Sequence, residues 1–134
     1  MPKRRYRVFL SHASDDLWVA EQIAAAIERC GASTFLDRRD IAAGDNFKQR
    51  IRKEMPSCDE LVALFTPWSR RRAWVRHEIG MADVLGKRIV CVLYKVFIAD
   101  FDADEDGRGP LEDLNFVDIN ALEIYFKELS KRAR

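Results

Sequence analysis

Glu78 is the residue of this sequence whose position most needs a chemical explanation. The segment RRAWVRHEIGMADVLG (residues 71–86) has the pattern of an amphipathic helix. At about 100° per residue, Glu78 falls on the apolar arc of that helix, with Trp74 and Leu85. A carboxylate there needs either a partner or a ligand. It is either a pocket-edge carboxylate paired with an arginine such as Arg71, or a carboxylate that faces a ligand.

The other reactive side chains form incomplete sets. Ser11, His12 and Ser14 lie close together, but the sequence has no GxSxG turn, and His12 is too near both serines in the chain to serve as their base. His12 and His77 are the only histidines, and no cysteine lies near either, so no zinc site is predicted. GxGxxG and GxxxxGK[ST] are both absent, which argues against Rossmann and P-loop enzymes.

The acidic segment DADEDGRGPLED (residues 102–113) partly matches a calcium-binding loop. Its twelfth position is Asp113 rather than the bidentate glutamate, and Gly109 and Pro110 do not suit the loop geometry. We therefore predict a solvated acidic loop, and no metal site in the chain.

Strand-like and helix-like patterns alternate along the whole sequence, and these elements must position Glu78. The predicted strands span residues 6–11, 33–37, 60–66, 89–95 and 115–119, and the predicted helices span 15–30, a segment starting after Asp45, 71–86 and 121–134. Ser14 is placed to cap the first helix, and Gly31 to end it.

This alternation predicts an α/β protein with a flavodoxin-like three-layer fold. Strands 60–66 and 89–95 are almost continuously apolar, as expected of central parallel strands. The expected five-stranded parallel sheet has the order 2-1-3-4-5, with helices on both faces. In that order the carboxyl ends of the first and third strands border a crevice, onto which residues 11–14 and the helix of Glu78 should both open. Glu78 is thus predicted to lie near a ligand site.

Length and composition indicate a single domain spanning residues 1–134. Lys and Arg number 23 against 22 Asp and Glu, so overall charge gives no argument for nucleic-acid binding. No apolar run approaches the roughly 18 residues of a membrane span, so no membrane association is expected. Three cysteines without CxxC spacing suggest reduced thiols, and we expect a cytoplasmic protein.

Three segments together resemble the signature regions of the Toll/interleukin-1 receptor (TIR) domain family. They are YRVFLSHASDD (residues 6–16), FLDRRDIAAGDNF (35–47) and WVRHE (74–78), in the family's order and spacing. The resemblance covers essentially the whole chain and is strongest to the bacterial NAD-cleaving type, such as Thoeris-like defence proteins. The family contains both scaffolds that assemble through their loops and enzymes that cleave NAD+.

The resemblance implies that Glu78, at the end of a Trp-x-x-x-Glu segment, is the catalytic residue, and that NAD+ is the substrate with no separate cofactor. The residues that it implies for NAD+ binding are Phe9, Ser11, His12, Ala13, Ser14, Asp37, Arg38 and Trp74. The loop at 38–47 would cover the cleft and contact a neighbouring TIR domain. Arg72 and Val75 depart from the usual family residues around the tryptophan.

The function expected from the resemblance is that of an NAD+ hydrolase or cyclase. It would release nicotinamide and ADP-ribose, or a cyclic ADP-ribose signal, in antiphage defence. A downstream effector would then sense the nucleotide product. The alternative is a non-enzymatic TIR–TIR adaptor or a host-mimicking effector, and a more distant one is a nucleoside-transferring enzyme on a related sheet.

Overall fold

Five parallel strands form one sheet in the order β2-β1-β3-β4-β5, which confirms the predicted topology. The computed structural model describes residues 4–36, 47–71, 73–104, 107, 109–111 and 113–134. The strands are β1 (Arg7–Ser11), β2 (Ser33–Leu36), β3 (Glu60–Phe65), β4 (Arg88–Leu93) and β5 (Asn115–Asp118). All six residues of β3 are buried, as expected of a central strand.

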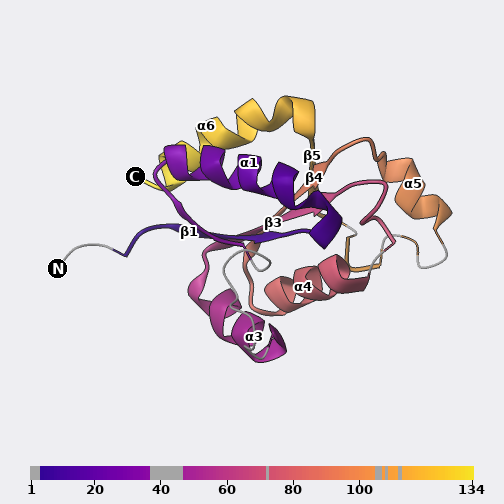
Figure 1. The fold of residues 1–134 in the computed structure, drawn as a ribbon, viewed down its shortest axis with the longest axis horizontal. Helices are drawn as coiled ribbons and strands as arrows, with labels where there is room; N and C mark the ends of the chain where they lie inside the picture. The colour runs from indigo at the N-terminus through magenta and orange to yellow at the C-terminus, as the bar shows by residue number, and fades with distance from the viewer. Residues whose placement is uncertain (1–3, 37–46, 72, 105–106, 108, 112) are drawn as a thin grey trace.

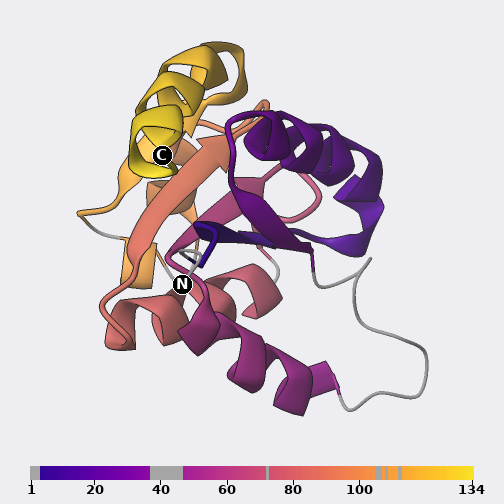
Figure 2. The ribbon, with the colours of Figure 1, turned by 90° about the vertical axis from the view of Figure 1, so that its left-hand side faces the viewer.

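Helices cover both faces of this sheet. They are α1 (Leu17–Arg29), α3 (Phe47–Ser57), α4 (Ala73–Val84), α5 (Ile98–Ala103) and α6 (Leu122–Arg132). Figure 1 shows α1 and α6 on one face and α3 and α4 on the other, and Figure 2 shows the same three layers after a quarter turn. Among the described helices, none is long and apolar enough to cross a membrane.

Side chains of the sheet alternate between two apolar cores. The core under α3 and α4 includes Phe9, Phe35, Ile51, Met55, Val75 and Ile79. The core under α1 and α6 includes Val8, Leu10, Ala24, Ile27, Tyr125 and Leu129. Each large apolar side chain buried in this way contributes about 1.5–3 kcal/mol, so both helical layers hold the sheet. Ser11 follows Phe9 by two residues and therefore points toward the α3–α4 side.

The predicted start of the first helix is wrong, and one residue predicted on the apolar arc of α4 is exposed. Ser14 does not cap α1, because a 3-10 turn (Ser14–Asp16) precedes that helix and its N-cap is Asp16. Asp16 makes no capping bond either, since its carboxylate accepts a hydrogen bond from Thr66 instead. Helix α4 ends at Val84, and Gly86 with its positive φ of 69° lies just past that end. Leu85 is 43% exposed, so its predicted place on the apolar arc is wrong.

The acidic segment also differs from the prediction. Its first residues, 102 and 103, complete the short helix α5, which the sequence analysis missed. Phe101 anchors this helix by packing edge-on against Phe65, with ring centroids 5.1 Å apart. Earlier in the chain, Gly31 has a φ of 100° directly after α1 and its C-cap, which confirms its predicted role in ending that helix.

Candidate active site

Glu78 lies in the second turn of α4 and is completely buried, at 0% exposure. Its neighbours on the buried face of the helix are Val75, Ile79 and Ala82. The hydroxyl of Ser11, the last residue of β1, donates a hydrogen bond to Oε1 of Glu78. The structure therefore brings the carboxylate and the carboxyl end of the first strand into direct contact.

The residues around Ser11 are buried to different degrees. His12 is 0% exposed, and its Nδ1 lies 2.7 Å from the carbonyl oxygen of Ala13. Ala13 is also buried, whereas Ser14 is exposed. Phe9 packs on the ring of Phe35, with centroids 5.1 Å apart, and is part of the core. Of the predicted binding residues in this segment, only Ser14 is open to a ligand in this conformation.

A buried hydrogen bond ties the connection after β1 to the connection after β3. The hydroxyl of Thr66 donates to Oδ2 of Asp16 at 2.8 Å, and both side chains are buried. The Thr66 amide in turn donates to the hydroxyl of Ser69 at 2.8 Å. The sequence analysis missed this link, because Asp16 resembles an ordinary acidic residue in the first turn of a helix.

Arg71, the arginine suggested as a partner of Glu78, contacts a different carboxylate. Its guanidinium contacts Asp104 at 3.2 Å, and Arg70 holds the same carboxylate through two hydrogen bonds of 3.0 Å. These contacts join the segment before α4 to the end of α5. Among the described residues, no group of three or more acidic, histidine or cysteine side chains is placed to hold a metal.

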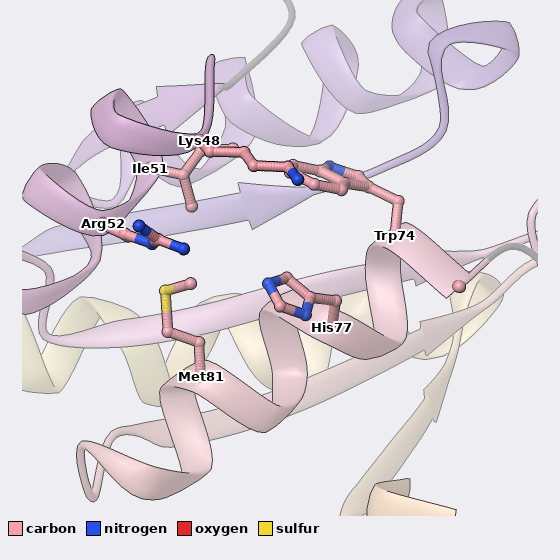
Figure 3. Close-up of a pocket in the computed structure, with 7 residues that line it drawn as sticks. Lys48, Ile51, Arg52, Trp74, His77 and Met81 are labelled. Atoms are coloured by element: carbon pink, nitrogen blue, oxygen red, sulfur yellow. The ribbon is translucent and has the colours of Figure 1, made fainter. Parts of the chain in front are cut away.

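A cavity of about 310 Å³ lies between α3 and α4, on the outer side of this core. Its walls are formed by Lys48, Ile51, Arg52, Ala73, Trp74, His77 and Met81 (Figure 3). The rings of Trp74 and His77 stack, with centroids 5.9 Å apart and planes inclined by 27°. Among the described residues, Trp74 is the one predicted site residue that lines this cavity. Lys48 and Arg52, one turn apart on α3, were not singled out in the sequence analysis, although this spacing places both on one face of the helix.

Asp37 and Arg38, the remaining predicted binding residues, lie outside the described part of the chain, as does nearly all of the loop at 38–47. Within the described residues, Ser11 and Glu78 meet as the sequence analysis expected. Trp74, one turn before Glu78, faces the α3–α4 cavity.

Comparisons with known proteins agree on one family. A family model described as TIR domain matches residues 8–131. A probable 2′ cyclic ADP-D-ribose synthase of Brachypodium distachyon, BdTIR, is 28% identical over 98 residues, covering 72% of this chain and 44% of that protein. The 2′ cyclic ADP-D-ribose synthase BtTIR of Bacteroides thetaiotaomicron is 21% identical over 103 residues, covering 74% and 36%. The chain thus spans less than half of the length of these relatives.

The fold has a close counterpart among solved structures. The TIR domain of the Toll-related receptor TRR-2 from Hydra magnipapillata superposes with a TM-score of 0.68 at 19% identity. The match covers 93% of this chain and 94% of that one. At this identity the likeness concerns the fold, including the five-stranded sheet that carries the site.

Proposed function

Because the chain belongs to the TIR-domain family, we propose that it cleaves NAD+ at the bond between nicotinamide and ribose. The observation that carries this proposal is the position of Glu78, a buried carboxylate on α4 in contact with the carboxyl end of β1. Ligands of open α/β sheets bind at this edge, where the strand order reverses. The named activity of BdTIR and BtTIR supports the same chemistry.

The chemistry requires a single carboxylate. As the bond from the anomeric carbon to nicotinamide breaks, the bonding electrons leave with the ring, which departs as a neutral molecule. Positive charge then develops on the ribose, as in glycoside hydrolysis. Glu78 would stabilise this charge and hydrogen-bond the ribose hydroxyls. Water attack gives ADP-ribose, whereas attack by a hydroxyl of the ADP-ribose itself gives a cyclic product.

Access to Glu78 requires a conformational change, because Glu78, Ser11 and His12 are all 0% exposed. In our proposal, substrate binding opens the contact between α4 and the end of β1, and the ribose then reaches the carboxylate. We also propose that Asp37 and Arg38 contribute to NAD+ binding, as the family resemblance suggests. Self-association with other TIR domains, and an effector that senses the product, complete the proposed pathway.

Incubation with NAD+ and analysis of the products by mass spectrometry tests this function. We expect nicotinamide together with ADP-ribose or a cyclic isomer, and the loss of both with Glu78→Gln. Gln keeps the shape of the side chain and removes its charge, so the variant should remain folded. Unchanged NAD+ over a wide range of protein concentrations would contradict the proposal. The range should extend to concentrations at which the protein self-associates, so that an assembled form is also tested.

The second candidate function is a non-enzymatic TIR–TIR interaction module. The complete burial of Glu78 against Ser11 favours it, because a carboxylate held inside a core also serves a purely structural purpose. In that case Glu78→Gln would change the melting temperature and the self-association of the protein, and NAD+ would remain intact with the wild type.

A further inference from the structure

The cavity between α3 and α4 combines two cationic side chains with a platform of stacked rings. Lys48 and Arg52 are exposed on α3 and face Trp74, His77 and Met81 of α4 across the cavity (Figure 3). Aromatic and thioether side chains thus form one wall and long basic side chains the other. Such a cavity suits a ligand that has a flat ring next to negative charge.

The positive charge of this cavity is not balanced within the described part of the chain. No carboxylate lines it there. Glu54, the acidic residue of α3, instead forms salt bridges with Arg7 at 2.7 Å and Arg50 at 3.2 Å. Uncompensated cations that converge on a partly apolar cavity favour an anionic ligand.

The spacing of the two cations narrows the class of anion. Residues four apart on a helix project from the same face, with Cβ atoms about 5–6 Å apart. Lys48 and Arg52 have this spacing, so their charged groups can hold neighbouring phosphates of one diphosphate. Trp74 also links the cavity to the proposed chemistry, because it lies one helical turn before Glu78 on α4.

We infer that Lys48 and Arg52 form the diphosphate-binding part of the nucleotide site, and that the Trp74–His77 pair lies against a ring of the same nucleotide. This inference rests on the proposed function for the identity of the nucleotide as an adenine dinucleotide. The two basic residues determine affinity through charge, and the chemical step at Glu78 does not depend on them.

Binding of ADP-ribose, measured by isothermal titration calorimetry, tests this inference without any catalytic turnover. ADP-ribose contains the diphosphate and adenine but no nicotinamide. We expect K48Q/R52Q to bind it at least about tenfold more weakly, because the variant loses both cationic donors to the diphosphate. The affinity of the wild type should also fall as NaCl increases, and that of K48Q/R52Q should fall less.

Lys53→Gln is the matched control, because Lys53 is exposed on the same helix and does not line the cavity. It removes a positive charge from α3 and should leave the affinity for ADP-ribose unchanged. Equal affinities for the wild type and K48Q/R52Q would overturn the inference. So would an equal loss with Lys53→Gln, or no binding of ADP-ribose by the wild type.

Kinetics separate this inference from the proposed function. In an active enzyme, K48Q/R52Q should raise KM for NAD+ about tenfold and leave kcat near the wild-type value. If the protein cleaves NAD+ but K48Q/R52Q binds ADP-ribose as tightly as the wild type does, the inference is overturned and the proposed function remains supported. Binding that depends on this pair, without cleavage of NAD+, would overturn the function and support the inference.

Discussion

Glu60 and Glu78 are both completely buried, but Glu60 lies at the amino ends of the parallel strands and Glu78 at their carboxyl ends. Glu60 begins β3 and accepts hydrogen bonds from the hydroxyl of Tyr6 at 2.6 Å, from the hydroxyl of Tyr125 and from the guanidinium of Arg132 at 3.1 Å. The described hydrogen bond to Glu78 comes from a neutral hydroxyl, that of Ser11. The contacts of Glu60 thus lie at the amino ends of the strands, and the described contact of Glu78 lies at their carboxyl ends.

In our proposal, this difference in position separates a structural charge from one placed for chemistry. A guanidinium offsets much of the cost of burying Glu60, and together with the tyrosines it joins β3 to α6 and to the residues before β1. Burial and the neighbouring Glu60 raise the pKa of Tyr6 to about 12, and they raise the pKa of Tyr125 as well. Glu78 lies instead at the carboxyl ends of the strands, where in the proposed reaction it would stabilise a positively charged transition state.

Replacement of Glu60 should have the largest effect on stability. We expect Glu60→Gln to lower the free energy of unfolding by about 2–3 kcal/mol, because it removes the charge that Arg132 and two tyrosines contact. The melting temperature should fall by roughly 8 °C in a thermal unfolding experiment. Glu128→Gln, at an exposed position of α6, is the control and should have little effect. An unchanged melting temperature for Glu60→Gln would contradict the structural role.

Alkaline pH should weaken the contacts among Glu60, Tyr6, Tyr125 and Arg132 at the amino ends of the strands. The folded-state pKa of Tyr6 is raised to about 12, against about 10 in an unfolded chain. The folded state therefore holds its proton longer, and stability is fully present below pH 10 and declines toward pH 12. Buried Cys58 and Cys91, whose pKa values burial raises to about 11 and 12, act in the same direction from a lower pH.

Denaturant unfolding between pH 8 and pH 12 measures this decline. Its slope is at most about 1.4 kcal/mol per pH unit for each proton retained by the folded state, and the partial exposure of Tyr6 reduces its share. The slope should be shallower for Tyr6→Phe than for the wild type. Equal slopes would show that Tyr6 does not titrate differently in the folded and unfolded states.

Removal of the Ser11 hydroxyl should affect catalysis more than folding. In the proposed enzyme, Ser11→Ala should lower kcat for NAD+ about tenfold, the rate equivalent of one hydrogen bond to a charged group. Its hydroxyl orients Glu78, so KM should change little. Ser130→Ala, which removes a hydroxyl from α6 on the opposite layer, is the control. If Ser11→Ala and Ser130→Ala have the same kcat, the hydroxyl does not position Glu78.

Calcium should have the smallest effect. Asp104 resembles Glu60 in that arginines compensate its charge: Arg70 and Arg71 both contact it. We therefore expect no rise in melting temperature at micromolar calcium. A clear rise would mean that the acidic segment binds the metal in preference to the arginines.

Most of the fold followed from the sequence because long-range packing and local pattern agree in it. The apolar runs of β3 and β4 read as central strands and are buried in the structure. Helix α5 was missed because its sequence, IADFDA, is short and acidic, and only the packing of Phe101 on Phe65 holds it in place. A contact between residues 36 positions apart cannot be predicted from a local sequence pattern.

The site could be predicted in part. Glu78 stood out because a charge on an apolar arc breaks a local rule, and Ser11 followed from the strand order. The second buried carboxylate, Glu60, could not be found in this way, because its partner Arg132 is far away in the sequence. The cavity beside Trp74 forms only where α3 and α4 pack side by side, and the sequence does not show that packing. Lys48 and Arg52 therefore looked like ordinary surface charges.

The central claim is that Glu78 serves chemistry and Glu60 serves the fold. NAD+ cleavage per folded molecule, measured for Glu78→Gln and Glu60→Gln below their melting temperatures, tests it most directly. We predict a loss of about a hundredfold or more for Glu78→Gln with a melting temperature close to the wild type. Glu60→Gln should melt lower and retain most of its activity. Wild-type turnover by folded Glu78→Gln would contradict the account.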